Sequence, residues 1–229
     1  MISLKPEVVF NIGNFHITNT YLASLIAMMF IVSFSIIFNK KIKEIPDKIQ
    51  TLLEIIYEGF YNFWSNLTGV KNIKIFAFCF TFFIYILLSN WFGILPGFGS
   101  IYIKHHEEKA HLLRTTYSDL NMTLALGLIS VIGANILGLI KLRFEFIKKF
   151  LNPIGLLELF SEISKILSFS LRLFGNILAG EILILSVSLL IPFLVPIPFM
   201  LLEIFVGFIQ ALIFFTLTSI FLKVAISHH

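Results

Sequence analysis

Long uncharged apolar stretches constrain this chain more than any other feature of its sequence. Residues 18–38, 75–95 and 120–140 contain no charged side chain, and as a helix each is long enough to cross about 30 Å of hydrocarbon. The whole chain is 58% hydrophobic and 13% charged, whereas soluble domains are about 25% charged and need that charge to cover a water-facing surface. We therefore expect a membrane protein with several spans.

Residues 47–66 follow a different pattern. Their apolar side chains recur at helical spacing along one face: Ile49, Leu52, Leu53, Ile56, Phe60 and Phe63. The opposite face carries polar and charged groups: Lys48, Glu54, Glu58 and Asn62. This pattern predicts an amphipathic helix that lies on the membrane surface.

The last third of the chain contains the longest helical segments. At about 1.5 Å per residue, a helix over 153–190 is roughly 57 Å long, so it must tilt steeply or lie partly along the interface. Pro192, Pro196 and Pro198 then mark a turn, and a second apolar stretch covers 199–226. The two segments predict a steeply tilted antiparallel hairpin.

Together these segments predict an all-α polytopic membrane protein, a single membrane domain over 1–229 with five transmembrane helices and one interfacial helix. Basic residues cluster between spans one and two and between spans three and four: Lys40, Lys41, Lys43, Lys48, Lys71, Lys74, Lys141, Arg143, Lys148 and Lys149. In the loop over 96–118, basic residues are offset by Glu107 and Glu108. The positive-inside rule then places the amino terminus outside and the carboxyl terminus in the cytoplasm. The start, MISLKPEVVF, lacks the pattern of a cleaved signal peptide, so the first span is expected to remain.

Ionisable residues occur inside the long segment, where placing a charge in hydrocarbon costs free energy. At about 100° per residue, five polar side chains share one stripe of this helix: Glu158, Glu162, Lys165, Arg172 and Asn176. Glu181 falls well off that stripe, about 13 Å along the axis from Arg172. A second set shares one face of the final helix: Glu203, Gly207 and Gln210.

Two readings of the stripe are open. Its groups can form a buried seam that holds helices together, or they can act in transport, and both readings stand for Glu158, Glu162 and Lys165. Arg172 differs, because Ser168 and Asn176 are its polar neighbours one turn away and neither is acidic. An arginine with no acid within one turn on its own helix indicates an acidic partner elsewhere.

Two motifs in this part of the chain, SLRLFGNILAGE and LEIFVGFIQALIFFTLTSIFL, resemble subunit a of the F-type ATP synthase, the stator of its membrane proton channel. LSNWFGILPG and SDLNMTLALG extend the resemblance over nearly the whole chain. The resemblance implies that the family's essential arginine is Arg172, that its asparagine and acidic channel residue are Asn176 and Glu181, and that its glutamine is Gln210. Many members carry histidine where this chain has Glu203, which shifts a detail of the proton relay.

The resemblance also implies the partners: a ring of c subunits with one carboxylic acid each, the peripheral-stalk b subunits, the F1 sector indirectly, and the lipid bilayer. It implies no cofactor, no metal, no nucleic acid and no catalytic activity of the chain on its own. A ring acid that approaches Arg172 is favoured as carboxylate and releases its proton. The same fixed charge repels a hydronium ion and blocks a direct leak, and arginine, unlike lysine, does not lose its proton.

Two offset half-channels are then expected on either side of Arg172. Glu181 and Glu203 are predicted to line the outer half, while Glu158, Glu162 and Ser168 belong to the cytoplasmic half. Asp119 opens the third span, where the readings of a helix N-cap and of an outer channel mouth are equally favoured.

Other candidate sites are weaker. The segment KHHEEKAH at 104–111 indicates a solvated outer loop rather than a metal site, because adjacent histidines on a flexible segment converge poorly. Cys79 is the only cysteine, which excludes an internal disulfide, and it is assigned to packing.

Gly175 and Glu181 make the motif similar to bacterial or plastid relatives. We expect a multi-pass protein of the bacterial plasma membrane, with the plastid or mitochondrial inner membrane as the alternative. Two competing functions are a self-contained secondary transporter or channel in which Arg172 binds an anionic substrate, and a structural scaffold. No internal repeat is visible, which disfavours the transporter.

Overall fold

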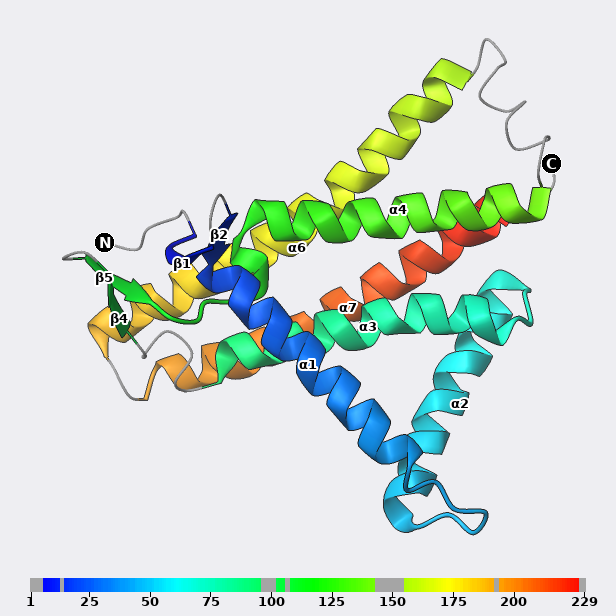
Figure 1. The fold of residues 1–229 in the computed structure, drawn as a ribbon, viewed down its shortest axis with the longest axis horizontal. Helices are drawn as coiled ribbons and strands as arrows, with labels where there is room; N and C mark the ends of the chain where they lie inside the picture. Colours follow the sequence, from blue (N-terminus) through cyan, green and yellow to red (C-terminus); the bar gives the residue numbers. More distant parts are fainter. Residues whose placement is uncertain are drawn as a thin grey trace.

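The computed structural model describes residues 6–12, 15–95, 102–105, 108–142, 155–191 and 194–226 (Figure 1). Within these ranges the chain forms six α-helices: α1 Asn19–Asn39, α2 Lys48–Thr68, α3 Ile73–Ile94, α4 Leu120–Leu142, α6 Gly155–Leu190 and α7 Pro196–Ile226. The other elements are two antiparallel β-hairpins and a 3-10 helix: β1 Val8–Ile12 with β2 Phe15–Thr18, β4 Tyr102–His105 with β5 Glu108–His111, and η1 Thr116–Ser118. All of these α-helices except α2 are long and apolar enough to cross a membrane, which makes five candidate spans. The predicted all-α polytopic membrane fold is therefore confirmed.

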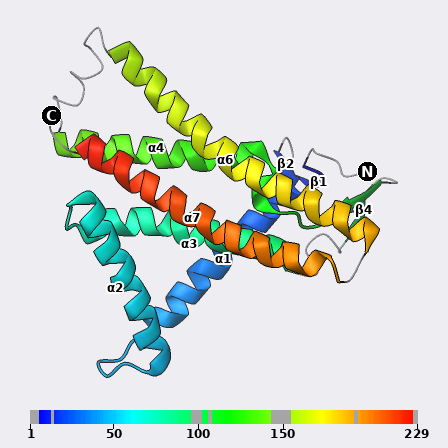
Figure 2. The same cartoon turned by 180° about the vertical axis from the view of Figure 1, so that it is seen from behind.

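The long helices form two layers (Figures 1 and 2). In one layer α3 and α4 run with their axes roughly aligned, and in the other α6 and α7 cross them obliquely. α3 packs on α7, and α4 packs on both α6 and α7. α6 is one unbroken helix of 36 residues, about 54 Å long at the usual rise, so it fits the hydrocarbon only at a steep tilt.

The hairpin of α6 and α7 differs from the prediction at its turn. α7 begins at Pro196, so Pro196 and Pro198 lie in its first turn and not in the connection. Proline is tolerated there because the first N–H groups of a helix have no partner within the helix. The prediction that these two prolines mark the turn is therefore wrong, and Pro192 lies outside the described residues.

α2 joins the bundle through its carboxyl-terminal half. The Phe60 ring lies 4.6 Å from Phe83 of α3 and 5.8 Å from Phe215 of α7, measured between ring centroids. Trp64 is fully buried, whereas Ile49 and Leu52 near the start of α2 are 71% and 58% exposed. The apolar face predicted for this helix is thus divided between the aromatic core and the molecular surface, and its exposed part is available to lipid.

Buried polar contacts hold the two layers in register. The hydroxyls of Ser130 on α4 and Thr218 on α7 lie 2.9 Å apart, and the Ser170 hydroxyl of α6 donates to the Thr123 carbonyl of α4. The close approach of α4 and α6 depends on Gly127, where an added Cβ would lie 2.8 Å from Ser170 Oγ. Small and hydroxyl-bearing residues play this part in membrane helix packing generally.

Both hairpins lie at the end of the molecule where α6 connects to α7 (Figure 1). Glu7 links them, because its carboxylate accepts a hydrogen bond of 2.7 Å from the His111 backbone N–H and its carbonyl accepts one from Asn19 N–H. Most of the segment 104–111, predicted as a solvated loop, belongs to the hairpin of β4 and β5, whereas His106 and Glu107 lie outside the described residues.

Candidate functional site

Arg172 projects from the middle of α6 onto the surface of the bundle. Its side chain is exposed, and its guanidinium donates to the hydroxyl of Ser168 one turn earlier, at 3.2 Å. Within the part of the chain that the structure describes, no ion pair includes Arg172. The surrounding surface of α6 is apolar, with Leu167 46% and Leu171 55% exposed.

The stripe that the sequence predicts on α6 is split in the structure. Glu162 and Lys165 are partly buried against α4 and α7, whereas Arg172 faces outward and Asn176 is half-buried. Because α6 crosses α4 obliquely, one face of the helix meets the bundle near its start and leaves it near its middle. The stripe therefore spans two environments, one inside the bundle and one on its surface.

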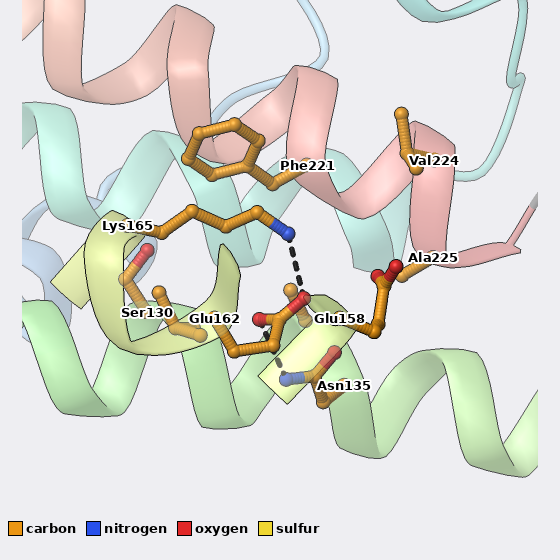
Figure 3. A pocket seen from close by; sticks show the side chains of 10 residues that line it. Ser130, Asn135, Glu158, Glu162, Lys165, Phe221, Val224 and Ala225 are labelled. Atoms are coloured by element: carbon orange, nitrogen blue, oxygen red, sulfur yellow. Dashed lines mark hydrogen bonds and ion pairs between the residues drawn. The ribbon is translucent and has the colours of Figure 1, made fainter. Parts of the chain in front are cut away.

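A polar pocket lies between α4, α6 and α7 (Figure 3). Its lining consists of Ser130, Val131, Ala134, Asn135, Glu158, Glu162, Lys165, Phe221, Val224 and Ala225. We call it the α4–α6–α7 pocket. It contains two residues predicted for the cytoplasmic half-channel, Glu158 and Glu162; the third, Ser168, instead accepts a hydrogen bond from Arg172.

Glu162 is the centre of the hydrogen bonding in this pocket (Figure 3). One carboxylate oxygen lies 2.6 Å from Lys165 Nζ, and the other accepts a bond of 3.0 Å from Asn135 Nδ2 on α4. The Lys165 ammonium also lies 5.0 Å from the centroid of the Phe221 ring, a cation–π contact. The ammonium and amide thus compensate the Glu162 charge inside the bundle, which is the requirement for burying a carboxylate.

A second cluster of polar side chains lies toward the opposite end of α6. Glu181 forms an ion pair of 3.1 Å with Arg114, and the two side chains are only 17% and 13% exposed. Glu203 of α7 lies against Gly180, where an added Cβ would be 2.5 Å from its Oε1 atom. Glu181 and Glu203 are close enough to interact electrostatically. We call Arg114, Glu181 and Glu203 the outer charge cluster.

The polar face of α7 continues inward from Glu203. Gly207 receives the side chain of Asn90 from α3, whose amide donates to the Gly207 carbonyl at 3.2 Å. Gln210 is only 6% exposed. Within the described residues the structure shows no hydrogen bond between Gln210 and Arg172.

Asp119 has the geometry of a helix cap. One carboxylate oxygen accepts from the Asn121 backbone N–H at 2.9 Å, and the other accepts from the Thr20 hydroxyl at 3.2 Å. Asp119 is 7% exposed and so ties the start of α4 to the start of α1. Of the two readings left open from the sequence, the cap has direct structural support.

Two residues that the sequence did not single out complete these groups. Arg114 pairs with Glu181 across 67 positions of the chain, and Asn135 bonds Glu162 across 27 positions. Neither contact follows from helical spacing, because each joins different elements.

Comparison with known proteins gives a consistent result. Residues 21–223 match the family described as ATP synthase A chain. The chain is 33% identical over 216 residues to ATP synthase subunit a of Gloeobacter violaceus, covering 92% of this chain and 84% of that protein. It is 35% identical over 206 residues to the chloroplastic ATP synthase subunit a of Stigeoclonium helveticum, covering 87% and 80%. For the subunit a of Geobacter sulfurreducens the identity is 31% over 227 residues, covering 96% and 91%.

The match extends from α1 to the last turns of α7 and so includes every site residue predicted from the sequence. The chain therefore belongs to the ATP synthase A chain family.

Proposed function

We propose that this chain is the proton-translocating stator subunit of the F0 sector of an ATP synthase, without catalytic activity of its own. The observation that carries the proposal is the position of Arg172, exposed at the middle of a membrane-spanning helix on an apolar surface. An arginine facing hydrocarbon costs at least about 2.5–3.5 kcal/mol, so this surface needs a partner that supplies an acid in mid-membrane. A ring of c subunits with one carboxylic acid each provides that partner.

The α4–α6–α7 pocket and the outer charge cluster fit two offset half-channels. Glu162 precedes Arg172 by about 15 Å and Glu181 follows it by about 13 Å along α6, at about 1.5 Å per residue. We assign the α4–α6–α7 pocket, with Glu158 and Glu162, to the cytoplasmic half. We assign the outer charge cluster, together with Asn176 and Gln210, to the path between the outer side and the ring, with Asp119 at its mouth.

Between these groups α6 buries three large apolar side chains. Phe169, Leu173 and Ile177 of α6 are 2%, 0% and 1% exposed, and the Phe169 ring packs 4.4 Å from Phe214 of α7. A proton cannot cross this layer without a large desolvation cost. The remaining connection between the two sites is the outer surface at Arg172, where a ring acid passes.

In the proposed cycle each ring acid arrives protonated, loses its proton to one half-channel as it nears Arg172, and passes as a carboxylate. The other half-channel then returns a proton to it. The arginine stabilises the passing carboxylate and repels hydronium ions, which prevents a leak between the halves. Ser168, one turn before Arg172, positions its guanidinium by a hydrogen bond, and Asn176 lies one turn after it on the same stripe.

The remaining partners and the location are part of the same proposal. The chain assembles with peripheral-stalk b subunits and, through them, with the F1 sector, in a bacterial plasma membrane. The competing transporter function requires Arg172 to face a substrate pocket, and the lining of the α4–α6–α7 pocket does not include it.

The test is ATP-driven proton pumping in inverted membrane vesicles that contain the complete ATP synthase. Arg172→Ala should abolish coupled pumping while the complex still assembles, and Arg172→Lys should fail as well, since an ammonium can lose its proton and lacks the planar fork. Lys141→Ala, which removes an exposed positive charge at the end of α4, is the matched control and should pump normally. Normal pumping by Arg172→Ala would overturn the proposal.

A further inference from the structure

The ion pair between Arg114 and Glu181 has no part in the proposed cycle as described so far. Arg114 lies just before η1, and η1 packs against α6. Its guanidinium meets the Glu181 carboxylate at 3.1 Å, with both side chains mostly buried. Arg114, which lies outside the candidate membrane spans, therefore places its positive charge beside the Glu181 carboxylate on α6.

The charges of the outer charge cluster do not balance. Glu181 and Glu203 contribute two carboxyl groups and Arg114 contributes one guanidinium. In the described residues the structure shows no hydrogen bond or ion pair to the Glu203 carboxylate, and Glu181 is a charged group close enough to act on it electrostatically. With both carboxyl groups ionised the cluster has a net charge of −1, and one added proton makes it neutral.

We propose that Arg114 is a positioning residue of the outer half-channel that compensates the charge of Glu181, so that the outer charge cluster accepts and releases a single proton. The inference rests on the proposed function. Arg114 holds the Glu181 carboxylate toward η1, and a proton that reaches the cluster meets one uncompensated negative charge. Without Arg114 two uncompensated carboxylates lie side by side, and like charges in a poorly solvated site repel strongly.

A purely structural role, in which the Arg114–Glu181 pair holds the segment before η1 against α6, is a weaker explanation. The same segment is already tied to the start of α1 by the hydrogen bond from Thr20 to Asp119. A buried ion pair contributes little net stability, because desolvation offsets the attraction between the charges. Removal of one partner, by contrast, leaves the other as an uncompensated buried charge.

The experiment uses the complete ATP synthase in inverted vesicles and compares the variants Arg114→Gln, Arg114→Lys and Glu181→Gln with the double variant Arg114→Gln/Glu181→Gln. Arg114→Gln should lower the rate of ATP-driven proton pumping about tenfold, within the range expected for directly interacting charges. Arg114→Lys keeps the charge and should restore most of that rate. The double variant should pump within about twofold of Glu181→Gln alone, because Arg114 acts through Glu181.

Normal pumping by Arg114→Gln, or losses that simply multiply in the double variant, would overturn the inference. The inference would also be overturned if Arg114→Gln failed to assemble and the added Glu181→Gln substitution did not restore assembly. That result would mean that Arg114 is needed for the structure of the complex. Arg172→Ala, measured in parallel, separates the two proposals. If it abolishes pumping while Arg114→Gln does not alter it, only the role of Arg114 is wrong.

Discussion

At the scale of single residues, the positions of the charged groups follow from how each charge is compensated. Glu162 has Lys165 and Asn135, and Glu181 has Arg114. Arg172 has only the Ser168 hydroxyl within the described residues. In the proposed function the uncompensated charge of Arg172 is the site where the ring binds, and the compensated charges on either side belong to the two half-channels.

Gly180 provides a test of the outer charge cluster at this scale. In Gly180→Ala the new Cβ would lie 2.5 Å from Glu203 Oε1 and 2.9 Å from its Cδ, so the Glu203 carboxyl group must move from its present position. We expect normal assembly, because the end of a flexible side chain shifts easily, and a loss of pumping of about tenfold, since misplacement by about 1 Å can cost up to 10²-fold. Proton pumping in vesicles and co-purification of the subunits measure the two effects.

The shorter acid serves as the rescue for this variant. Glu203→Asp withdraws the carboxyl group by one methylene, so the double variant Gly180→Ala/Glu203→Asp should pump faster than Gly180→Ala. Equal rates would mean that the contact between positions 180 and 203 does not limit transport.

At the scale of elements, the functional surface depends on the oblique crossing of α6 over α4. Close contact at Gly127, with the hydrogen bond from Ser170 to Thr123, fixes where the two helices touch. That contact point decides which residues of α6 face the α4–α6–α7 pocket and which remain on the surface beside Arg172.

Gly127→Ala tests this crossing. Its Cβ would meet Ser170 Oγ at 2.8 Å and the backbone oxygen of Ile166 at 3.1 Å, and the backbone cannot move aside easily. We expect a loss of about 1–3 kcal/mol in the free energy of unfolding, typical of overpacking, measured by denaturant titration of the purified protein in detergent. Gly59→Ala is the control, because no atom lies within 4 Å of its Cβ; it should be neutral or stabilising by up to about 1 kcal/mol. Equal stability of the two variants would contradict the tight crossing.

At the scale of the whole molecule, the two polar groups lie toward opposite ends of the bundle. In the outer charge cluster, Arg114 closely follows β5, and Glu181 and Glu203 lie near the α6–α7 connection in their helices. The α4–α6–α7 pocket is formed by the first turns of α6, the second half of α4 and the last turns of α7. Five crossings, as the candidate spans predict, place the start of α1 and the end of α7 on opposite sides of the membrane.

This orientation is testable with single cysteines and a membrane-impermeant maleimide. Ile45 in the link between α1 and α2 is 85% exposed, and Leu194 in the α6–α7 connection is 77% exposed. We expect Ile45→Cys to be labelled in inverted vesicles and Leu194→Cys only in right-side-out vesicles, since the positive-inside rule places the α1–α2 link in the cytoplasm. Cys79, which is buried, should remain unlabelled in the parent protein. Labelling of both cysteines from one side would contradict the five-span topology.

The sequence by itself determined the features that depend on the membrane as a solvent. A hydrocarbon layer of about 30 Å requires long uncharged helices, so the spans, the amphipathic α2 and the length of α6 could be predicted from composition and periodicity. The unusual cost of an arginine in mid-membrane likewise marks Arg172 without any structure.

The tertiary structure decided which groups meet. Periodicity gives the direction of a side chain around its own helix axis, but not the neighbour that covers that face. Lys165 and Arg172 share a stripe by periodicity, yet the oblique crossing of α6 leaves one inside the bundle and the other on its surface. The pairing of Arg114 with Glu181 joins positions 67 residues apart, and only the packing of η1 on α6 brings those two charges together, because contacts between elements are set by packing and not by local spacing.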